Sequence, residues 1–315
     1  MLSESTHVVF AEAYDANAIE RMRTLGRVTV LDTCDEETLT AAVRDCDALL
    51  VRSTAPVTRA VLAQADRLKV IGRGGVGLEN IDVEAARERG IVVVHTPAAA
   101  TGAVADLTLG LMISLLRQIA SGDTSVRAGH FAEARRRSLS HEMGALTLGI
   151  VGMGRIGRSV ARRCRHGFGM SILYNDIVAP GLLDFVATPL EKSELYKRAD
   201  IVSLHVPLTE TTRSLIDEQA LGAFKPGALL INTARGGVVD AVAVARALAT
   251  NRLGGVAFDV FEPEPPPEDH PLLRAPNTLF TPHVGARTHT GLRRMNAVVE
   301  DVIRVLQGTK PLFPG

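Results

Sequence analysis

Short apolar runs alternate with longer amphipathic stretches along this chain of 315 residues. The first series of apolar runs covers residues 7–10, 27–31, 48–52, 69–72 and 91–95. Stretches with helical periodicity, such as 35–45 and 56–64, lie between them. Strands that alternate with helices in this way predict an α/β fold with a mostly parallel, doubly wound sheet.

A second series of apolar runs predicts a second sheet. Its members are residues 147–151, 170–174, 185–187, 200–206, 228–232, 255–260 and 278–281. They are sufficient for a complete dinucleotide-binding sheet with a strand added. Because the chain is also long for one hydrophobic core, we expect two domains. The first comprises residues 1–98 together with 287–315, and the second comprises residues 99–286.

Two further segments are predicted to be helices with special positions. The segment 102–120 is small and apolar, which is too hydrophobic for a free helix surface. Asp106 and Arg117 interrupt it, so we expect a buried crossover and dimerisation helix rather than a membrane span. Residues 288–307 predict an amphipathic helix that is closed by Gly308 and packs on the first domain.

Charge and cysteine usage narrow the partners and the compartment. The 35 basic and 35 acidic residues balance, so no net field favours nucleic acid or an anionic membrane as a partner. Cys34, Cys46 and Cys164 are odd in number and lack metal-ligand spacing, which predicts core thiols in a reducing compartment and no metal site. Residues 1–20 show no signal-peptide pattern. We therefore expect a cytoplasmic protein.

The segment Thr147–Arg158 reads TLGIVGMGRIGR, an apolar strand followed by a glycine turn and a helix start. Glycines at the G-x-G-x-x-G spacing let the backbone approach a pyrophosphate, whose charge then lies against free N–H groups of the helix. The expected cofactor contacts in this turn are Gly152, Gly154, Arg155, Ile156 and Gly157.

Asp176 follows the next apolar segment, 19 residues (176 − 157) after Gly157. A carboxylate at this position accepts hydrogen bonds from the adenosine ribose hydroxyls and repels a 2′-phosphate. No Lys or Arg occurs between Asp176 and Glu191. The sequence therefore favours NAD over NADP as the cofactor.

Polar or glycine-rich loops follow two strands of the first domain. Carboxyl ends of parallel strands are where open α/β sheets bind ligands, and glycine-rich backbone exposes N–H groups that can hold a carboxylate. The alternative is a mobile turn that only connects strand to helix. The expected substrate-binding residues in these loops are Arg52, Ser53, Gly74, Gly75 and Val76.

Three strand ends of the second domain carry complementary chemistry. Arg235 follows ALLIN, Asp259 lies in VAFDVF, and His283 follows TLFTP. A guanidinium suits a bidentate grip on a carboxylate, an imidazole is a proton donor, and a carboxylate can orient that imidazole. Glu262 and Glu264, both close after Asp259, are rivals for that orienting role.

In this order, the motifs resemble those of the D-isomer-specific 2-hydroxyacid dehydrogenases over essentially the whole chain. They are the glycine turn with Asp176, His205-Val-Pro-Leu-Thr, Asn232-Thr-Ala-Arg235-Gly-Gly, Asp259-Val-Phe-Glu-Pro-Glu264-Pro and Pro282-His283-Val-Gly. The loops around Arg52 and Gly74 are most similar to those of phosphoglycerate dehydrogenases. We expect no regulatory C-terminal domain after the last helix.

The resemblance implies a flavodoxin-like substrate domain and a Rossmann domain, with the substrate between them. It also implies an NAD-dependent oxidoreductase that interconverts a D-2-hydroxy acid and its 2-oxo acid by hydride transfer. The apolar segment 102–120, in turn, suggests a homodimer. Arg235 would bind the substrate carboxylate, His283 would be the acid-base group, and Glu264 would hydrogen-bond His283. A carboxylate beside an imidazole stabilises the protonated, donor form.

The resemblance further implies a set of cofactor contacts and leaves the substrate open. Backbone amides of Gly75 and Val76 would grip the substrate carboxylate. Arginines such as Arg52 suit a phosphate, so 3-phosphoglycerate is a candidate beside glyoxylate and hydroxypyruvate. An NAD-sensing corepressor without turnover is the alternative function. The residues implied for the cofactor groove are His205, Pro207, Thr233 and Asp259.

Overall fold

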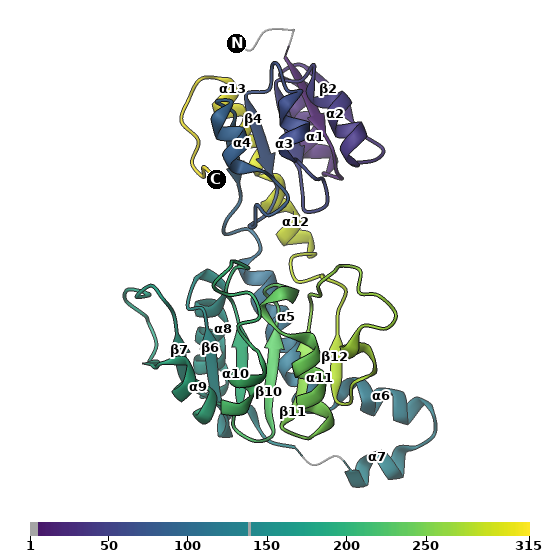
Figure 1. The fold of residues 1–315 in the computed structure, drawn as a ribbon, viewed down its shortest axis with the longest axis vertical. Helices are drawn as coiled ribbons and strands as arrows, with labels where there is room; N and C mark the ends of the chain where they lie inside the picture. Colours follow the sequence, from purple (N-terminus) through teal and green to yellow (C-terminus); the bar gives the residue numbers. More distant parts are fainter. Residues whose placement is uncertain (1–5, 138–139) are drawn as a thin grey trace. The chain divides into compact units, whose positions relative to one another are not determined.

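The computed structural model describes residues 6–137 and 140–315 and divides them into two compact units (Figure 1). Unit 1 comprises Met1–Ala100 and Arg287–Gly315, and unit 2 comprises Thr101–Ala286. Each unit is an α/β structure built around its own parallel sheet.

Within the described residues, unit 1 contains a five-stranded sheet with the strand order β2-β1-β3-β4-β5. All of its strand pairs are parallel. This is the flavodoxin-like order, which confirms the predicted fold of the first domain. The strands are β1 (His7–Phe10), β2 (Arg27–Val30), β3 (Ala48–Val51), β4 (Val70–Arg73) and β5 (Val92–His95).

Helices cover both faces of this sheet, which explains why its central strands are continuous apolar runs. Val8 and Leu50 pack in the cluster that contains residues of α1 and α13, whereas Val9 and Leu49 pack in the cluster of α2, α3 and α4. The helices are α1 (Ala16–Arg23), α2 (Glu36–Val43), α3 (Arg59–Ala63), α4 (Val83–Glu88), α12 (His289–Asn296) and α13 (Val298–Leu306).

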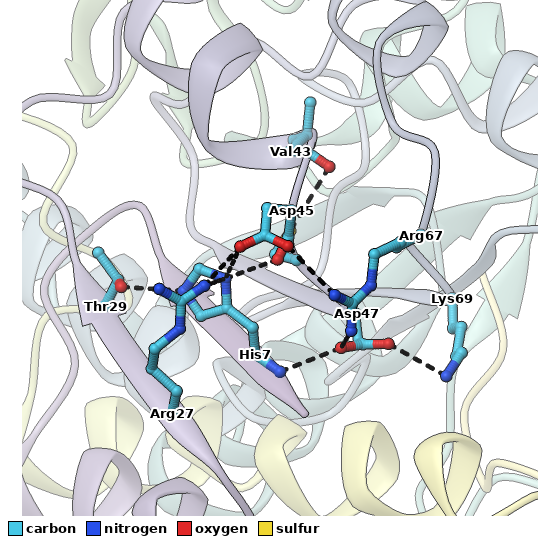
Figure 2. A network of polar contacts seen from close by, with 9 residues as sticks. His7, Arg27, Thr29, Val43, Asp45, Asp47, Arg67 and Lys69 are labelled. Carbon is cyan, nitrogen blue, oxygen red and sulfur yellow. Dashed lines mark hydrogen bonds and ion pairs between the residues drawn. The ribbon is translucent and has the colours of Figure 1, made fainter. Parts of the chain in front are cut away.

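Charged side chains join the amino ends of the strands of unit 1 (Figure 2). Asp47, which precedes β3 and is buried, accepts hydrogen bonds from the backbone N of His7 at 3.0 Å and from Arg67 at 2.9 Å. It also pairs with Lys69 at 3.1 Å. The amino ends are therefore bound to one another by ion pairs, and the loops predicted to bind substrate lie at the opposite, carboxyl ends.

Unit 2, over its described residues, contains a seven-stranded sheet in the order β12-β11-β10-β9-β6-β7-β8. The adjacent strands β6 and β9 form the point at which the strand order reverses. This is the predicted dinucleotide-binding sheet with β12 added at one edge. The strands are β6 (Thr147–Val151), β7 (Ser171–Asn175), β8 (Thr188–Pro189), β9 (Ile201–Leu204), β10 (Ala228–Asn232), β11 (Leu253–Phe258) and β12 (Thr278–Phe280).

The helices of unit 2 also lie on both faces of the sheet. Residues of α5 and α8 form one apolar cluster with the strands, and residues of α9, α10 and α11 form the other. Figure 1 shows that α6 and α7 stand away from this sheet. The helices are α5 (Thr101–Leu116), α6 (Ile119–Arg127), α7 (Phe131–Arg137), α8 (Arg155–Phe168), α9 (Lys192–Arg198), α10 (Glu218–Ala223) and α11 (Ala241–Ala249). Three short 3-10 turns, at Met143–Ala145, Gly236–Val238 and Pro271–Arg274, complete the helical segments of the described chain.

The prediction of a single helix over residues 102–120 was wrong. Helix α5 ends at Leu116, Gln118 adopts a left-handed backbone with φ 53°, and α6 begins at Ile119 at an angle of 58°. Among the described residues no single helix is long and apolar enough to cross a membrane, although this bent pair meets the requirement by length and composition alone.

Two other predicted elements differ from the structure. The segment 288–307 forms two helices, since α12 ends at Asn296 and α13 begins at Val298. Asn296 is buried, and its side chain accepts a hydrogen bond from Arg52. Gly308, with φ 72°, follows the second helix as predicted. The strand expected at 185–187 is displaced to β8, because Phe185 is buried in the apolar cluster of α5 and α8 and Thr188 pairs with β7.

Candidate active site

The glycine turn after β6 requires glycine for steric reasons. Gly152 has φ 93°, and a Cβ on it would lie 2.6 Å from the backbone oxygen of His205. A Cβ on Gly157 would lie 2.0 Å from the backbone oxygen of Gly152. At Gly152 and Gly157 the turn therefore packs against the end of β9 and against its own backbone without room for a side chain.

The N-terminus of α8 is prepared for an anion. Asp15 and Asp240 cap α1 and α11 with their carboxylates, but the residue before α8 is Gly154, which has no side chain to cap the helix. A Cβ on Gly154 would meet open space. Because N–H groups at a helix start bind phosphate, this cradle fits the pyrophosphate of NAD, and the first residues Arg155 and Ile156 lie at it.

Asp176 follows β7 and is bonded to backbone N–H groups of the same region. Its Oδ2 accepts a hydrogen bond from Met153 N at 2.6 Å, and its Oδ1 accepts one from Val178 N at 2.9 Å. The carboxylate is thereby held against the glycine turn. This position agrees with the expected one beside a bound dinucleotide, and contact with the ribose remains a prediction.

His205 lies at the end of β9, beside the glycine turn. Its Nε2 is 2.9 Å from Ser203 Oγ, whereas its buried Nδ1 has no hydrogen-bond partner among the residues that the structure describes. Burial lowers the pKa of His205 to about 3, so the ring is neutral. Pro207 is exposed nearby, and the buried Thr233 shares a hydrogen bond of 2.9 Å with Thr108 of α5.

His283 and Glu264 come together after β12 and β11. His283 Nδ1 lies 2.7 Å from Glu264 Oε2, and Glu264 Oε1 accepts a hydrogen bond from Phe261 N at 2.9 Å. The rival Glu262 pairs instead with Arg213 at 2.9 Å. The His283 side chain remains 46% exposed. A carboxylate thus orients the imidazole through Nδ1, which leaves Nε2 to exchange a proton with a ligand.

Asp259 holds the turn that carries His283. Its buried carboxylate accepts hydrogen bonds from Thr281 Oγ1 at 2.5 Å, Val284 N at 2.9 Å and Gly285 N at 2.8 Å. Its backbone oxygen accepts a hydrogen bond from His283 N at 2.8 Å. These bonds stabilise the left-handed backbone of His283, which has φ 50°. The contact of Asp259 with the nicotinamide end remains a prediction.

Arg235 follows β10 in a loop that Asn232 shapes. Asn232 Nδ2 donates to the backbone oxygen of Arg235 at 2.9 Å, and its Oδ1 accepts from Ala234 N at 3.0 Å. The half-buried guanidinium of Arg235 donates to the backbone oxygen of Ala234 at 2.7 Å. The side chain is therefore held at the carboxyl end of the sheet, as are those of Asp259 and His283.

A cavity of about 590 Å³ lies beside His283 and Glu264 in unit 2. The edge strand β12 contributes Phe280, and the segments after β11 and β12 contribute most of the remaining wall. Thr281 also lines it. Its apolar walls are formed by Phe261, Pro265, Pro266, Leu273, Phe280 and Pro282.

The predicted substrate loops of unit 1 are held by internal bonds. Arg52 donates from Nε to the backbone oxygen of Ala13 at 2.6 Å and from the guanidinium to Asn296 Oδ1, and its Cζ lies 4.5 Å from the centre of the Tyr14 ring. Another guanidinium nitrogen lies 3.5 Å from the sulfur of Met295. The guanidinium is thus engaged inside unit 1. Ser53, next in the chain, is exposed.

Some backbone N–H groups of the glycine loop after β4 are also engaged in hydrogen bonds within unit 1. Gly74 N donates to Val51 O at 2.9 Å, and Gly75 N donates to Arg73 O at 2.9 Å. Gly75 has φ 153°, and a Cβ on it would overlap the guanidinium of Arg73. Val76 N makes no hydrogen bond to the part of the chain that the structure describes. Val76 therefore carries an N–H of this loop that is available to a ligand.

Comparison with known proteins agrees with this geometry. Residues 109–285 match the model of the D-isomer specific 2-hydroxyacid dehydrogenase, NAD binding domain. The chain is 41% identical to a glyoxylate reductase of Korarchaeum cryptofilum, over 85% of this chain and 82% of that protein. It belongs to the D-isomer specific 2-hydroxyacid dehydrogenase family.

Two other relatives show the extent of the match. A D-3-phosphoglycerate dehydrogenase of Methanocaldococcus jannaschii is 39% identical over 96% of this chain, which spans only 57% of that relative's length. The crystal structure of the TT0316 protein of Thermus thermophilus has a TM-score of 0.90 at 37% identity, covering 98% of this chain and 99% of that one. Both sheets thus follow the fold of this family.

Sequence reasoning missed two residues, Tyr14 and Glu12, that hold the predicted substrate loops. Tyr14 OH donates to Val51 O at 2.8 Å, and Gly74 N lies 3.1 Å from that hydroxyl, so Tyr14 joins the two substrate loops. Glu12 accepts a hydrogen bond from Arg52 N at 2.6 Å. Both follow β1 at its carboxyl end, and that position is the signal that could have found them.

Proposed function

We propose that this protein is an NAD-dependent D-2-hydroxyacid dehydrogenase that interconverts a D-2-hydroxy acid and its 2-oxo acid. The observation that carries the proposal is the 2.7 Å contact between His283 and Glu264 at the strand ends of an NAD-binding domain. A carboxylate-oriented histidine beside a dinucleotide site is suited to transfer the hydroxyl proton that accompanies hydride transfer.

His283 moves the proton in this mechanism. NADH bound at the glycine turn supplies the hydride that reduces C2. With Nδ1–H donated to Glu264, His283 gives a proton from Nε2 to the oxygen on C2 in the reducing direction. In the oxidising direction the neutral ring accepts the hydroxyl proton at the same nitrogen. Glu264 keeps the ring orientation fixed in both directions.

Arg235 binds the carboxylate of the substrate. A guanidinium offers two parallel N–H donors to a carboxylate and stabilises negative charge that develops on the neighbouring oxygen. Asn232 holds the backbone of Arg235 in place for this contact. Within unit 1, Val76 N is the proposed donor to the substrate. Ser53 and the Gly74–Gly75 backbone shape the loops of that unit, and Arg52 supports them.

The arginines of unit 1 favour an unphosphorylated substrate. Arg52 is engaged with Ala13 and Asn296, and Arg59 pairs with Glu88 at 2.5 Å. Arg73 is buried against Gly75. A phosphate would have to displace these partners, whereas glyoxylate or hydroxypyruvate needs only a carboxylate site. We therefore rank small unphosphorylated 2-oxo acids above 3-phosphoglycerate.

Initial rates test the reaction. NADH oxidation is measured with glyoxylate, hydroxypyruvate and pyruvate, and NAD reduction is measured with D-glycerate and 3-phosphoglycerate. We expect turnover of the unphosphorylated acids. If none of the acids is turned over while NADH binds, the dehydrogenase proposal fails and the alternative of an NAD-sensing binding protein is supported.

The cofactor preference has its own test. Asp176, held by Met153 N and Val178 N, would meet a 2′-phosphate with a fixed negative charge. We expect Asp176→Ala to lower the ratio of kcat/KM with NADH to that with NADPH. An unchanged ratio would assign the preference to other residues.

We also propose that the protein is a cytoplasmic homodimer. Ile119, Val126 and Phe131 of α6 and α7 are large apolar side chains exposed on unit 2, as expected for a surface that a second copy covers.

Burial raises the pKa of the Cys46 and Cys164 thiols to about 12, which keeps them as inert thiols suited to a reducing compartment. Light scattering of the wild type and of Val126→Glu tests the homodimer, and a monomeric wild type would refute it. Cell fractionation tests the cytoplasmic location, and a secreted protein would refute it.

A further inference from the structure

The carboxyl end of β5 holds the glycine loop of unit 1 from one side. Thr96 N donates to the backbone oxygen of Gly75 at 3.0 Å, and His95 Nδ1 lies 2.9 Å from the backbone oxygen of Val76. Because a carbonyl oxygen only accepts hydrogen bonds, Nδ1 carries the proton of the His95 ring in this contact. Two consecutive carbonyls of the loop are therefore turned toward the end of β5.

This arrangement sets the direction of two N–H groups. The C=O and the N–H of a trans peptide point to opposite sides, and the cis peptides of the described chain lie elsewhere. The N–H groups of Val76 and Gly77 therefore both point away from β5. Neither makes a hydrogen bond within the described residues, and both residues are partly exposed, whereas Gly74 and Gly75 are buried. Successive N–H groups that point the same way form a concavity that binds anions.

The backbone of His95 is itself fixed. His95 pairs with Arg73 in the parallel sheet, and His95 N donates to the backbone oxygen of Phe313 at 3.1 Å. The C-terminal segment runs antiparallel beside β5 at this point, where Val94 pairs with Pro314. The end of β5 is thus held from both sides, and the imidazole reaches the glycine loop from a fixed strand end.

We propose that His95 is a positioning residue for substrate binding. Its imidazole holds the carbonyl of Val76 and thereby aims the N–H of Gly77, beside that of Val76, at the substrate. This inference rests on the proposed function, in which Val76 N is a donor to the substrate. Without the imidazole the Val76–Gly77 peptide would be able to rotate, because Gly77 has no side chain to resist the rotation. The two N–H groups would then no longer point the same way.

His95→Leu removes the donor and leaves an apolar side chain in its place. Steady-state kinetics with glyoxylate and saturating NADH should show a KM that is about tenfold higher, as expected when a hydrogen bond to a charged group is lost. The kcat should change less than about twofold, because His283 and the glycine turn of unit 2 are unaltered. An unchanged KM would overturn the proposal.

His95→Asn is the conservative variant. The side-chain nitrogen of asparagine is separated from Cα by the same number of bonds as Nδ1 of histidine, so it can donate to the same carbonyl. It should restore KM to within about threefold of the wild-type value. If KM stayed as high as in His95→Leu while the thermal midpoint equalled that of the wild type, the bond to the carbonyl would not be the cause and the proposal would fail.

His7 provides a matched control at the opposite end of the same sheet (Figure 2). Its Nδ1 lies 2.7 Å from the backbone oxygen of Asp45, and its Nε2 lies 2.9 Å from Thr29 Oγ1. His7→Leu therefore removes a comparable contact at the amino ends of the strands. We expect it to lower the thermal midpoint and to leave KM within about twofold. A rise in KM equal to that of His95→Leu would indicate a general loss of stability and would overturn the positioning role.

Oxamate, an unreactive analogue of 2-oxo acids, supplies a readout without turnover. Its Kd for the complex with NADH, measured by titration calorimetry, should rise about tenfold in His95→Leu and return close to the wild-type value in His95→Asn. If the wild type turned over no 2-oxo acid while oxamate binding kept this order, the proposed function would fail and the positioning role would stand. If the wild type turned over glyoxylate and His95→Leu had the same KM and Kd, the positioning role would fail and the dehydrogenase would stand.

Discussion

Arg52 follows β3 in unit 1 and His283 follows β12 in unit 2, so both lie at the carboxyl ends of parallel strands. The guanidinium of Arg52 is bonded to Ala13, Asn296 and Met295 and lies over the ring of Tyr14. His283 has one bond, to Glu264, on its imidazole within the described residues, and it is 46% exposed. Equivalent positions in two similar sheets are thus used for different purposes.

Position at the end of a strand therefore does not by itself make a residue bind a ligand. In unit 1 the polar side chains after β1 and β3 bind each other and fix the loops. In unit 2 His283 is oriented by Glu264 and its ring stays partly exposed for a ligand. Mutations should therefore affect stability in the first case and activity in the second.

The largest effect is expected at His283. His283→Ala should lower kcat/KM by about 10²–10⁴-fold, because general acid-base catalysis contributes that much. The thermal midpoint and NADH binding should be retained. His289→Ala, at an exposed position, is the control and should leave turnover unchanged. A variant at 283 with near-normal turnover would break the assignment of chemistry to unit 2.

Arg235→Lys should follow in size. The change keeps the charge but removes the bidentate fork, and charge-assisted hydrogen bonds contribute about 1.5–3 kcal/mol. We expect kcat/KM to fall about 10–100-fold, mainly through KM. Arg213→Lys, which alters the partner of Glu262, is the matched control. Equal kinetics of both variants would exclude a special role for Arg235.

The pair Glu264→Gln and Glu262→Gln sharpens the comparison within one loop. Loss of the carboxylate at 264 removes the charge that orients His283, and we expect kcat to fall by about tenfold for one charge-assisted hydrogen bond. Glu262 pairs with Arg213 at the surface, so its variant should change kcat less than twofold. Steady-state kinetics decide between them, and a larger loss at 262 would reverse the assignment.

Arg52→Met tests the other side of the comparison. It leaves Asn296 and the Ala13 carbonyl without their donor, and we expect the free energy of unfolding to fall by about 1–3 kcal/mol. The kcat/KM with glyoxylate should stay within about threefold, since the same energy does not enter substrate binding. Arg59→Met removes an exposed ion pair and should lower the free energy of unfolding less than Arg52→Met does. Chemical denaturation with parallel assays measures both, and a large kinetic loss with unchanged stability at 52 would contradict the contrast.

The last prediction concerns pH. The pKa of His205 is about 3 in the folded protein and 6.5 in the ordinary state, so only the unfolded chain takes up this proton between those values. The free energy of unfolding should therefore fall as the pH drops below 6.5, by about 1.4 kcal/mol per pH unit from this group. His205→Gln should show a shallower decline between pH 6.5 and 5 in denaturation experiments. Parallel curves for the two proteins would refute it.

Sequence reasoning located what depends on local patterns. The bounds of β1, β6 and β10 agree with the apolar runs, because a strand buried on both faces is a continuous run. The glycine turn was predictable since its residues are consecutive. Local patterns did not reveal the break at Gln118, which no glycine or proline marks, or the short strand at Thr188.

Contacts between distant residues explain the remaining differences. The bond between Arg52 and Asn296 joins residues 244 positions apart. The sequence therefore suggests an arginine available to a substrate, whereas in the fold its guanidinium is bonded to other residues of the chain. The choice between Glu262 and Glu264 depends on which carboxylate the loop turns toward His283. Both are glutamates two positions apart, and within the sequence only the family resemblance distinguishes them.

Because His283 has a left-handed backbone, the residue that serves the proposed reaction also lowers the stability of the folded protein. An L-residue in this conformation costs about 1–2 kcal/mol relative to glycine, although histidine tolerates it better than most. The bonds from Asp259 maintain it. A search for heat-resistant variants without selection for turnover would therefore recover His283→Gly, a protein that survives heating better and no longer reacts.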